Sequence, residues 1–596
     1  MFMKRNKTLL LIVLLTSFVS SFAQQETKKA SKFFNKGEFE KALIEYNKID
    51  TSAIGIDDNL RIGTCYFLSK KEKTKGIPFI EKYIQQADSI IPVAYFYLGS
   101  LYHKNYELDK AITTLEDFKI KLENEYAIDG ISKEIYTQFK KETETIIVNS
   151  NYGKTMMNSP RKVLVENLGD SINSKYQEYA PTISLNEKKL VYTSRRPTEE
   201  NEKISADGDY YENIYMSELK KGSLFESKEK EHTTGGGFFN LATPFEYSTA
   251  EKLPEVINRR AHDASIQLSN DGKKLYFYRD SDVWVTTQND SSWSSPIQLS
   301  AINSNSYEPS LFIALDENTM FITSEKEGGY GGLDIYVSEK DAAGNWSEMQ
   351  NLGPKINTAN DEDISYVSPE KDVIYFASKG HSSMGGYDIF KSKKKDGEWS
   401  APINMGSPIN TPYNDAFFIM PPKYNRGYYA SERTGGKGGM DLYRLTFATE
   451  RNPLAELAGL VLQGDSLVPA KSKITMLENE SFMNTIQNSN DSTGEYLLLV
   501  EHGKKYEMLV ETEGFAPYKK TFLIPEQIEY YQLYQEIHHV YLRDSEGNII
   551  GQQIITYNAF NDIESATRSA NDTIKQTFTK EIYSKYVRDN NNKLIG

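Results

Sequence analysis

The chain has 596 residues, with 83 acidic and 69 basic side chains and a formal net charge of −14. A single hydrophobic core seldom grows beyond roughly 250–300 residues, so this length indicates several domains. The acidic balance, without any basic block, excludes nucleic acid as a partner because phosphate binding needs clustered Lys and Arg. A single cysteine, Cys65, excludes a disulfide framework and Cys-rich metal sites, and it is expected to be a small core residue. The 40 Tyr and 28 Phe favour a strand-rich globular protein over a disordered one.

The first 23 residues have the pattern of a secretory signal peptide. Basic residues precede an apolar run over Leu9–Val19, and small residues lead to a predicted cleavage site between Ala23 and Gln24. The run is too short to span a bilayer, and no later stretch is as apolar. We therefore expect an exported chain whose mature form has no transmembrane span. No cysteine lies at the cleavage site, which argues against a bacterial lipid anchor.

Residues 24–155 are predicted to form tetratricopeptide-like helical repeats. Small residues recur at intervals near 34, the period of that repeat, in two sets: Ala30, Gly63 and Gly99, and Ala42, Gly76 and Ala111. Small side chains let paired helices approach closely, and a further amphipathic helix over Ile131–Asn149 is expected to cap the stack. Such a stack presents a concave surface to a peptide or partner. A spacer or docking platform for the next domain is the alternative, and the residues leave both open.

Residues 160–448 change to a period of about 53. Trp293, Trp346 and Trp399 are each 53 residues apart, and each opens a phrase that ends in Ile-Asn. A second recurring feature is an aspartate before a short apolar run, at Asp282, Asp334, Asp388 and Asp441. Alternating apolar runs bounded by turn residues lie between them and predict strands. Several strands in each repeat of this length are typical of the blades of a β-propeller.

The repeat phase predicts how the propeller closes. The phrase at 167–173 matches the one at 351–357, yet no blade precedes it, and the last blade stops after Phe447. We predict that Lys162–Leu168 supplies the outermost strand of the last blade, because closure by both ends leaves no raw edge at the junction. This phase predicts five blades. Insertions near Arg196–Asn213 and Lys220–Pro244 leave a sixth, degenerate blade open.

Residues 453–543 are predicted to form a small β-sandwich, because several short strand-like runs are separated by turn residues. Residues 544–596 are polar and are expected to be a tail, strand in part and then loose. The predicted fold class is therefore multidomain, α plus all-β: a helical solenoid, a propeller and a small sandwich.

The blade phrases resemble a known repeat. Gly331–Tyr336, Gly385–Phe390 and Gly438–Tyr443 are similar to the WD40-like repeats of TolB-type propellers, and Gly459–Ile524 resembles the carboxypeptidase regulatory-like domain. The order of signal peptide, tetratricopeptide repeats, propeller and regulatory-like domain is similar to Bacteroidetes-type periplasmic envelope proteins, including PorE-type and OmpA-family proteins. The resemblance implies the periplasm, peripheral at the outer membrane, and protein partners in an outer-membrane-linked assembly for type IX secretion or gliding.

One part of that family pattern has no counterpart here. The OmpA-like module that grips peptidoglycan in the family is not found among the residues after Arg543, so wall anchoring is not carried over. Residues 544–596 are interpreted as a remnant of the linker to that module.

The sequence contains no recognisable catalytic or cofactor motif. No Gly-x-Ser-x-Gly nucleophile elbow occurs. The glycine runs Gly328–Gly332 and Gly435–Gly439 precede strands, so they are interpreted as tight turns with positive φ rather than phosphate cradles. The acidic groups at 207–209 and 361–363 lack calcium-loop spacing and are expected to be surface turns. We predict no catalytic, metal or cofactor residue.

The recurring aspartates are interpreted as structural, each accepting backbone N–H bonds at the same turn of its blade. A ring of carboxylates around the channel is the alternative. The expected function is a non-enzymatic periplasmic scaffold or adaptor that binds envelope proteins through the helical groove and a propeller face. A glycan- or peptidoglycan-binding module is the alternative, and a hydrolase with its site in the channel is the third hypothesis.

Overall fold

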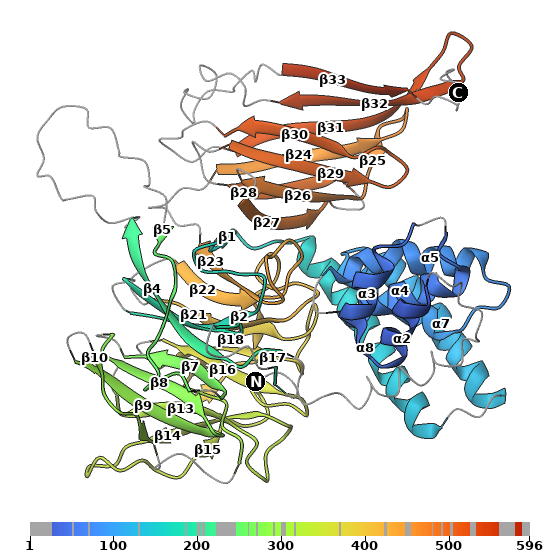
Figure 1. The fold of residues 1–596 in the computed structure, drawn as a ribbon. Helices are drawn as coiled ribbons and strands as arrows, with labels where there is room; N and C mark the ends of the chain where they lie inside the picture. Colours follow the sequence, from blue (N-terminus) through green and yellow to red (C-terminus); the bar gives the residue numbers. More distant parts are fainter. Residues whose placement is uncertain are drawn as a thin grey trace, which may run out of the picture.

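The computed structural model contains an N-terminal helical region, a series of antiparallel sheets and a C-terminal pair of sheets (Figure 1). The predicted cleavage site, Ala23 and Gln24, lies outside the described residues. The structure describes residues 27–50, 53–69, 72–128, 132–184, 188–198, 204–205, 209–221, 246–259, 261–269, 272–289, 292–299, 306–314, 317–368, 371–421, 426–447, 455–478, 481–489, 493–500, 505–524, 532–558 and 579–586.

The helical region consists of antiparallel neighbours that cross at small residues. Its α-helices are α2 (Lys28–Asn35), α3 (Phe39–Tyr46), α4 (Ile56–Leu68), α5 (Ile77–Gln86), α6 (Val93–Lys104), α7 (Leu108–Ile128) and α8 (Lys133–Met157). A Cβ added to Gly63 would lie 2.2 Å from Ile80, and one added to Gly99 would lie 2.6 Å from Leu115. The small residues therefore occur where α4 meets α5 and where α6 meets α7. Cys65 is fully buried in this region.

The last helix is longer than predicted. The sequence predicts an amphipathic helix ending at Asn149, whereas α8 continues to Met157. The Ser132 side chain accepts a hydrogen bond from the Ile135 amide at its start. Gly153 and Met157 in its last two turns are buried. The amphipathic pattern of a single helix does not predict this burial, because it depends on packing against other parts of the chain.

The middle of the chain forms successive antiparallel sheets (Figure 1). Each starts with its innermost strand, because the first strands of neighbouring sheets contact one another. The first has β2 (Glu178–Ile183), β3 (Lys189–Ser194), β4 (Asn213–Lys221), β5 (Glu246–Tyr247) and β6 (Glu251–Lys252). The second has β7 (Asp263–Leu268), β8 (Lys274–Arg279), β9 (Asp282–Asn289), β10 (Ser292–Trp293) and β11 (Ile297–Gln298). The third has β12 (Ser310–Ile313), β13 (Thr319–Ser324), β14 (Asp334–Glu339) and β15 (Gln350–Asn351).

The two remaining sheets of this region complete the series. One has β16 (Glu362–Val367), β17 (Val373–Ser378), β18 (Asp388–Lys395), β19 (Glu398–Trp399) and β20 (Ile403–Asn404). The last has β21 (Asp415–Ile419), β22 (Arg426–Ser431) and β23 (Asp441–Phe447), with β1 (Val163–Asn167) at its edge. These antiparallel sheets are consistent with a β-propeller.

Strand β1 closes the series from the other end of the chain. It pairs antiparallel with β23, from Val163 opposite Phe447 to Asn167 opposite Tyr443. The prediction that Lys162–Leu168 provides the outermost strand of the last sheet is confirmed. The innermost strands also contact one another in sequence: β2 with β7, β7 with β12, β12 with β16, β16 with β21, and β21 with β2.

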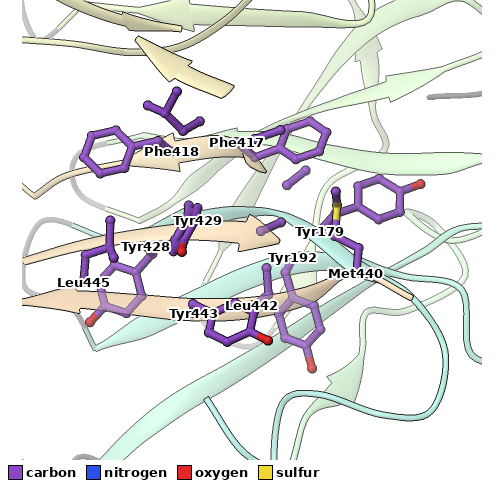
Figure 2. Close-up of a cluster of buried hydrophobic side chains, with 14 of the residues drawn as sticks. Tyr179, Tyr192, Phe417, Phe418, Tyr428, Tyr429, Met440, Leu442, Tyr443 and Leu445 are labelled. Atoms are coloured by element: carbon purple, nitrogen blue, oxygen red, sulfur yellow. The ribbon is translucent and has the colours of Figure 1, made fainter. Parts of the chain in front are cut away.

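The first and last sheets share a buried aromatic cluster. Figure 2 shows Tyr179 and Tyr192 of the first sheet beside Phe417, Phe418, Tyr428, Tyr429 and Tyr443 of the last. The rings of Tyr179 and Phe417 stack with their centroids 5.6 Å apart. Burial of aromatic surface on both sides of the junction stabilises the contact between the two ends of the series.

The C-terminal region is a pair of packed sheets. One has the order β25-β24-β31-β32-β33, with β28 also on β24, and the other has the order β27-β26-β29-β30. The bounds are β24 (Ala455–Gln463), β25 (Val468–Pro469), β26 (Ser472–Glu478), β27 (Ser481–Asn488), β28 (Glu495–Val500), β29 (Lys505–Thr512), β30 (Tyr518–Leu523), β31 (Gln532–Arg543), β32 (Ile549–Asn558) and β33 (Thr579–Tyr586). Their common core includes Leu164 of β1, so this pair covers the edge of the last middle sheet.

The C-terminal pair of sheets continues past residue 543, into the segment that the sequence predicts to be strand in part. Strand β32 pairs with β31, and β33 pairs with β32, so two strands of the expected tail belong to the same sheet. The turn after β31 is held by Asp544, which accepts the Asn548 amide at 2.9 Å. The polar composition of 544–596 concealed a half-buried strand in which Ile554 reaches the core. Among the described residues, no helix is long and apolar enough to span a membrane.

Candidate functional site

A groove lies between the helical region and two loops of the middle sheets. Its volume is about 980 Å³. Phe67 of α4, residues of α6 and one long face of α8 form its helical walls, and Gly385, Gly386 and Pro412 form the opposite wall. The remaining lining residues are Phe96, Ser100, His103, Lys104, Lys133, Glu134, Thr137, Gln138, Lys141, Glu142, Thr145, Ile146 and Asn149.

The floor of the groove is aromatic and tightly supported. Phe96 packs edge-on against Phe139 of α8 at 5.1 Å between ring centroids, and it lies 5.4 Å from Phe118 of α7. Phe67 lies 4.8 Å from Tyr97. Because these rings come from four helices and pack against one another, the floor is pre-formed and needs little ordering to receive an apolar side chain.

Polar contacts fix the wall that the sheets provide. Lys104 donates to the Pro412 carbonyl at 3.0 Å, and its ammonium lies 4.4 Å from the centroid of the Tyr413 ring. Asn149 of α8 donates to the Gly385 carbonyl at 2.8 Å. Burial lowers the pKa of Lys104, and the charges of Glu432 and Asp415 oppose that shift.

His103 joins α6 to α8 as a neutral side chain. Its Nδ1 lies 2.9 Å from Ser150 Oγ, and burial lowers its pKa to about 3. At neutral pH the ring therefore carries no charge, which suits a site where desolvation of an imidazolium would be costly. The contacts of His103 therefore indicate a structural role, which is to join α6 to α8 beside the groove.

Met384 is a buried apolar contact between the middle sheets and the helical region. It is fully buried in a cluster with Tyr106, Leu108 and Met157 of the helical region. Its own amide donates to Asp388 at 2.7 Å, which holds the loop that carries it. The helices are thus seated on the sheets by an inserted side chain as well as by polar bonds.

The C-terminal sheets brace the helices from another side. Asp109 at the start of α7 accepts hydrogen bonds from Lys154 of α8 and from Lys471. Burial raises the pKa of Asp109, but these two hydrogen bonds outweigh it and hold the pKa below its ordinary value. Lys473 also donates to Asn105 at 3.4 Å. One carboxylate therefore links α7, α8 and the C-terminal region.

The chemistry of the groove is that of recognition. An apolar floor, amide and hydroxyl groups on α8, and charges of both signs at the rim suit a peptide segment, whose backbone needs polar partners and whose side chains need apolar contact. Among the described residues, no group of three or more His, Cys, Asp or Glu side chains is arranged to hold a metal ion.

The signature aspartates lie at the turns before the third strands. Asp334 accepts the amides of Tyr330 and Gly331, and Asp441 accepts those of Lys437 and Gly438. Asp388 accepts the Met384 amide and the Asn404 side chain. Asp282 differs, because it follows a short turn and accepts from the Gln298 side chain. The carboxylates of Asp334, Asp388 and Asp441 are thus held by the backbone of their own turns, whereas that of Asp282 is not shown to be.

The signature tryptophans pack between neighbouring sheets. Trp399 is 7% exposed and lies 6.5 Å from Phe321 of the preceding sheet, measured between ring centroids. Trp293 and Trp346 pack, partly buried, against clusters that also include Val191 and Val283 of the preceding sheets. None of the three lines the groove.

The glycine turns are as predicted in part. Gly328 and Gly435 do have positive φ, at 88° and 85°. The glycines before the third strands are instead points of close approach: a Cβ on Gly331, Gly385 or Gly438 would lie 2.1, 2.4 or 1.6 Å from the nearest atom of the following sheet's entry loop. Their role is to let one sheet touch the next.

The acidic group at 361–363 is not the expected surface turn. Glu362 and Asp363 are 0% and 6% exposed, and the three carboxylates have different partners. Asp361 pairs with Lys379 at 2.8 Å, Glu362 accepts from Ser378 at 2.7 Å, and Asp363 accepts from Thr323 at 3.0 Å. Burial raises the pKa of Asp363 to about 6. Asp207 lies outside the described residues.

Sequence reasoning missed a second repeated carboxylate. Four of the innermost strands begin at a fully buried acidic residue or just after one. A hydroxyl or guanidinium group 16 residues later in the chain donates a hydrogen bond to each of these acids. The acids are Glu178, Asp263, Glu308 and Glu362. The fixed spacing of acid and donor was the available signal. The groove residues His103, Lys104 and Asn149 were also missed, because they follow no repeat. Met384, which lies beside the groove, was missed because the residue type at its position differs from loop to loop.

Comparison with known proteins adds little beyond the fold. No family model and no curated protein matches the chain. A tricorn protease aligns over 63% of this chain at 10% identity and a TM-score of 0.25, and the chain spans only 30% of that protease. A GH43_12 protein from a capybara gut metagenome aligns over 68% of this chain and 75% of its own, at 11% identity and a TM-score of 0.27.

A third similar structure is the GH43 BlXynB protein from Bacillus licheniformis. It aligns over 70% of this chain and 84% of its own, at 10% identity and a TM-score of 0.25. At these scores no argument about activity or ligand follows. The propeller-like assignment stands on the strand pairing and on the order of contacts between innermost strands.

Proposed function

We propose that this protein is a non-enzymatic scaffold of the bacterial periplasm, which holds a peptide segment of a protein partner in the groove between α6, α8 and the sheet loops. The observation that supports this most is the groove itself: about 980 Å³, with an aromatic floor and walls from two parts of the molecule. The lining offers contacts for a backbone and for apolar side chains, and its charged residues lie along α8, apart from Lys104 of α6.

The proposal includes the finer architecture. The middle sheets form a five-bladed propeller closed by β1, the helices are tetratricopeptide-like repeats, and the C-terminal sheets are a regulatory-like sandwich extended by β32 and β33. The outer-membrane-linked assembly, whether for type IX secretion or gliding, comes from the sequence resemblance alone. A rigid scaffold of this kind positions a partner by shape, and its affinity depends on a few well-packed anchors.

A photo-crosslinking experiment tests the groove. The full chain carries p-benzoylphenylalanine at Thr137, an exposed position on the groove face of α8. The control position is Ile44, which is 58% exposed on α3 and does not line the groove. After irradiation in cells of the source organism, we expect a protein adduct at 137 and none at 44.

A blocking variant makes the result specific. Thr145 is an exposed groove residue, so Thr145→Trp fills part of the groove while leaving the buried contacts intact. The adduct at 137 should fall at least tenfold in that background. An adduct that survives Thr145→Trp, or equal adducts at 137 and 44, would contradict binding in the groove. An adduct to cell-wall glycan in place of protein would favour the glycan-binding alternative.

A further inference from the structure

Three loops of the middle sheets share one geometry. Each runs ten residues from a serine that ends the second strand to the signature aspartate that begins the third: Ser324 to Asp334, Ser378 to Asp388, and Ser431 to Asp441. In each loop the residue four positions before the aspartate donates its amide to that carboxylate, at 2.6 Å for Tyr330, 2.7 Å for Met384 and 2.6 Å for Lys437. The loops therefore present one side chain each, at equivalent and rigid positions.

Two of these three side chains have partners within the molecule. Met384 is fully buried in an apolar pocket formed by Tyr106, Leu108 and Met157 of the helical region. Lys437 forms an ion pair with Asp170 at 2.5 Å. Met384 shows how an apolar side chain at this position can be bound: it enters an apolar pocket that another part of the molecule, the helical region, provides.

The third side chain, Tyr330, faces solvent. It is 50% exposed, whereas Met384 at the equivalent position is fully buried. A second hydrogen bond, from the Gly331 amide to the Asp334 carboxylate at 3.0 Å, holds the loop without any contact of the Tyr330 ring. At the base of the loop Lys326 pairs with Glu348 at 3.3 Å. An aromatic anchor with a polar rim has the composition of an interface hot spot.

We propose that Tyr330 is a docking knob for a second protein, which receives it in an apolar pocket between two α-helices as the helical region receives Met384. The loop needs no rearrangement, because its amides are already bonded to Asp334, so little conformational entropy opposes binding. The phenol ring supplies the apolar contact. The contact surface lies on the third sheet and is separate from the groove, so it extends the proposed scaffold function to a second site.

The knob is tested by crosslinking followed by affinity measurements. The full chain carries p-benzoylphenylalanine in place of Tyr330, with Ile297, 69% exposed on β11, as the control position. After irradiation in cells of the source organism, the crosslinked peptide is sequenced. We expect an adduct at 330 and none at 297, with the crosslinked peptide in a helical hairpin of the partner.

Affinity variants then separate a specific pocket from a chance neighbour. Against the purified partner, Tyr330→Ser should weaken binding at least tenfold. Tyr330→Met should stay within about threefold of the parent, because methionine at the equivalent position fits a helical pocket. Both variants should melt like the parent, since the side chain supports no buried contact of the loop.

Several results would overturn the inference. These are no adduct at 330, an adduct on a non-helical segment, or unchanged affinity for Tyr330→Ser. If any of them occurred while the adduct at Thr137 persisted, the knob would be refuted and the groove function would stand. The loss of both adducts would count against the scaffold as a whole.

Discussion

Side-chain amides and carboxylates in this protein chiefly join backbone segments. Each Asn of the Ile-Asn phrases within the described residues bonds both the N–H and the C=O of one residue on the third strand of the preceding sheet. Asn357 does so with Ile335 at 2.8 and 2.9 Å, and Asn410 with Ile389 at 2.8 and 2.8 Å. Asn173 makes the same pair of bonds with Leu442, which lies 269 residues later. The repeated polar residues are therefore structural clamps.

One buried side chain has no such partner. His539 of β31 is 0% exposed, and neither ring nitrogen has a hydrogen-bond partner among the described residues. Burial lowers its pKa to about 4 from the ordinary 6.5. An unsatisfied buried polar group costs about 1–3 kcal/mol, so His539→Leu should raise the melting temperature of the C-terminal sheets.

The same residue predicts a pH dependence. Between pH 6.5 and 4 the unfolded chain binds a proton that the folded imidazole does not, so stability is full above pH 6.5 and falls as the pH drops. The loss approaches about 3 kcal/mol at pH 4, at about 1.4 kcal/mol for each pKa unit. Calorimetry at pH 7 and pH 4.5 should show a larger benefit of His539→Leu at pH 4.5. An equal benefit at both pH values, or a loss, would contradict the assignment.

At the scale of elements, the junction between sheets depends on close backbone approach. Gly438→Ala places a Cβ 1.6 Å from the Tyr176 carbonyl oxygen, where the last sheet meets the first. Gly439→Ala is the matched control, because its Cβ would meet only the Gln177 side chain, at 3.2 Å. Gly438→Ala should destabilise the junction by about 2 kcal/mol or more, and Gly439→Ala by much less.

Hydrogen exchange of β22 and β23 measures this difference locally, which a single global melting curve of a multidomain chain does not. Faster exchange in Gly438→Ala alone is the expected result. Equal protection in both variants would show that the last and first sheets do not touch at this glycine.

The periodic elements could be predicted from the sequence, and the non-periodic ones could not. Recurring Trp and Asp residues predicted the strands, and the orphan phrase at 167–173 predicted β1, because each blade repeats the same local requirements. The pairing of the segment after Arg543 with the preceding sheet was not predicted, because its composition is polar while Ile554 alternates into the core. The role of Gly331 and Gly438 was missed because close approach between sheets leaves no pattern distinct from that of a tight turn.

At the scale of the molecule, the three regions brace one another. Met384 and Asn149 join the helices to the sheets, Asp109 joins them to the C-terminal region, and Leu164 of β1 lies in the core of that region. The candidate site could not be predicted from the sequence. Its walls come from residues that are more than 200 positions apart, such as Asn149 and Gly385, and no repeat relates them.

A strand encoded before the first sheet closes the last one. Glu166 of β1 and Arg444 of β23 are opposite in register and form an ion pair at 2.7 Å, with side chains 13% and 11% exposed. A charge-reversal cycle tests this pairing with the variants Glu166→Arg, Arg444→Glu and the double exchange. The readout is the free energy of opening of β23, measured by hydrogen exchange.

Each single reversal places like charges together and should lower that free energy by about 1–3 kcal/mol, and the double exchange should restore at least about 1 kcal/mol of the loss. A double variant whose loss equals the sum of the two single losses would show that the residues are not in contact. It would contradict closure of the sheets by β1.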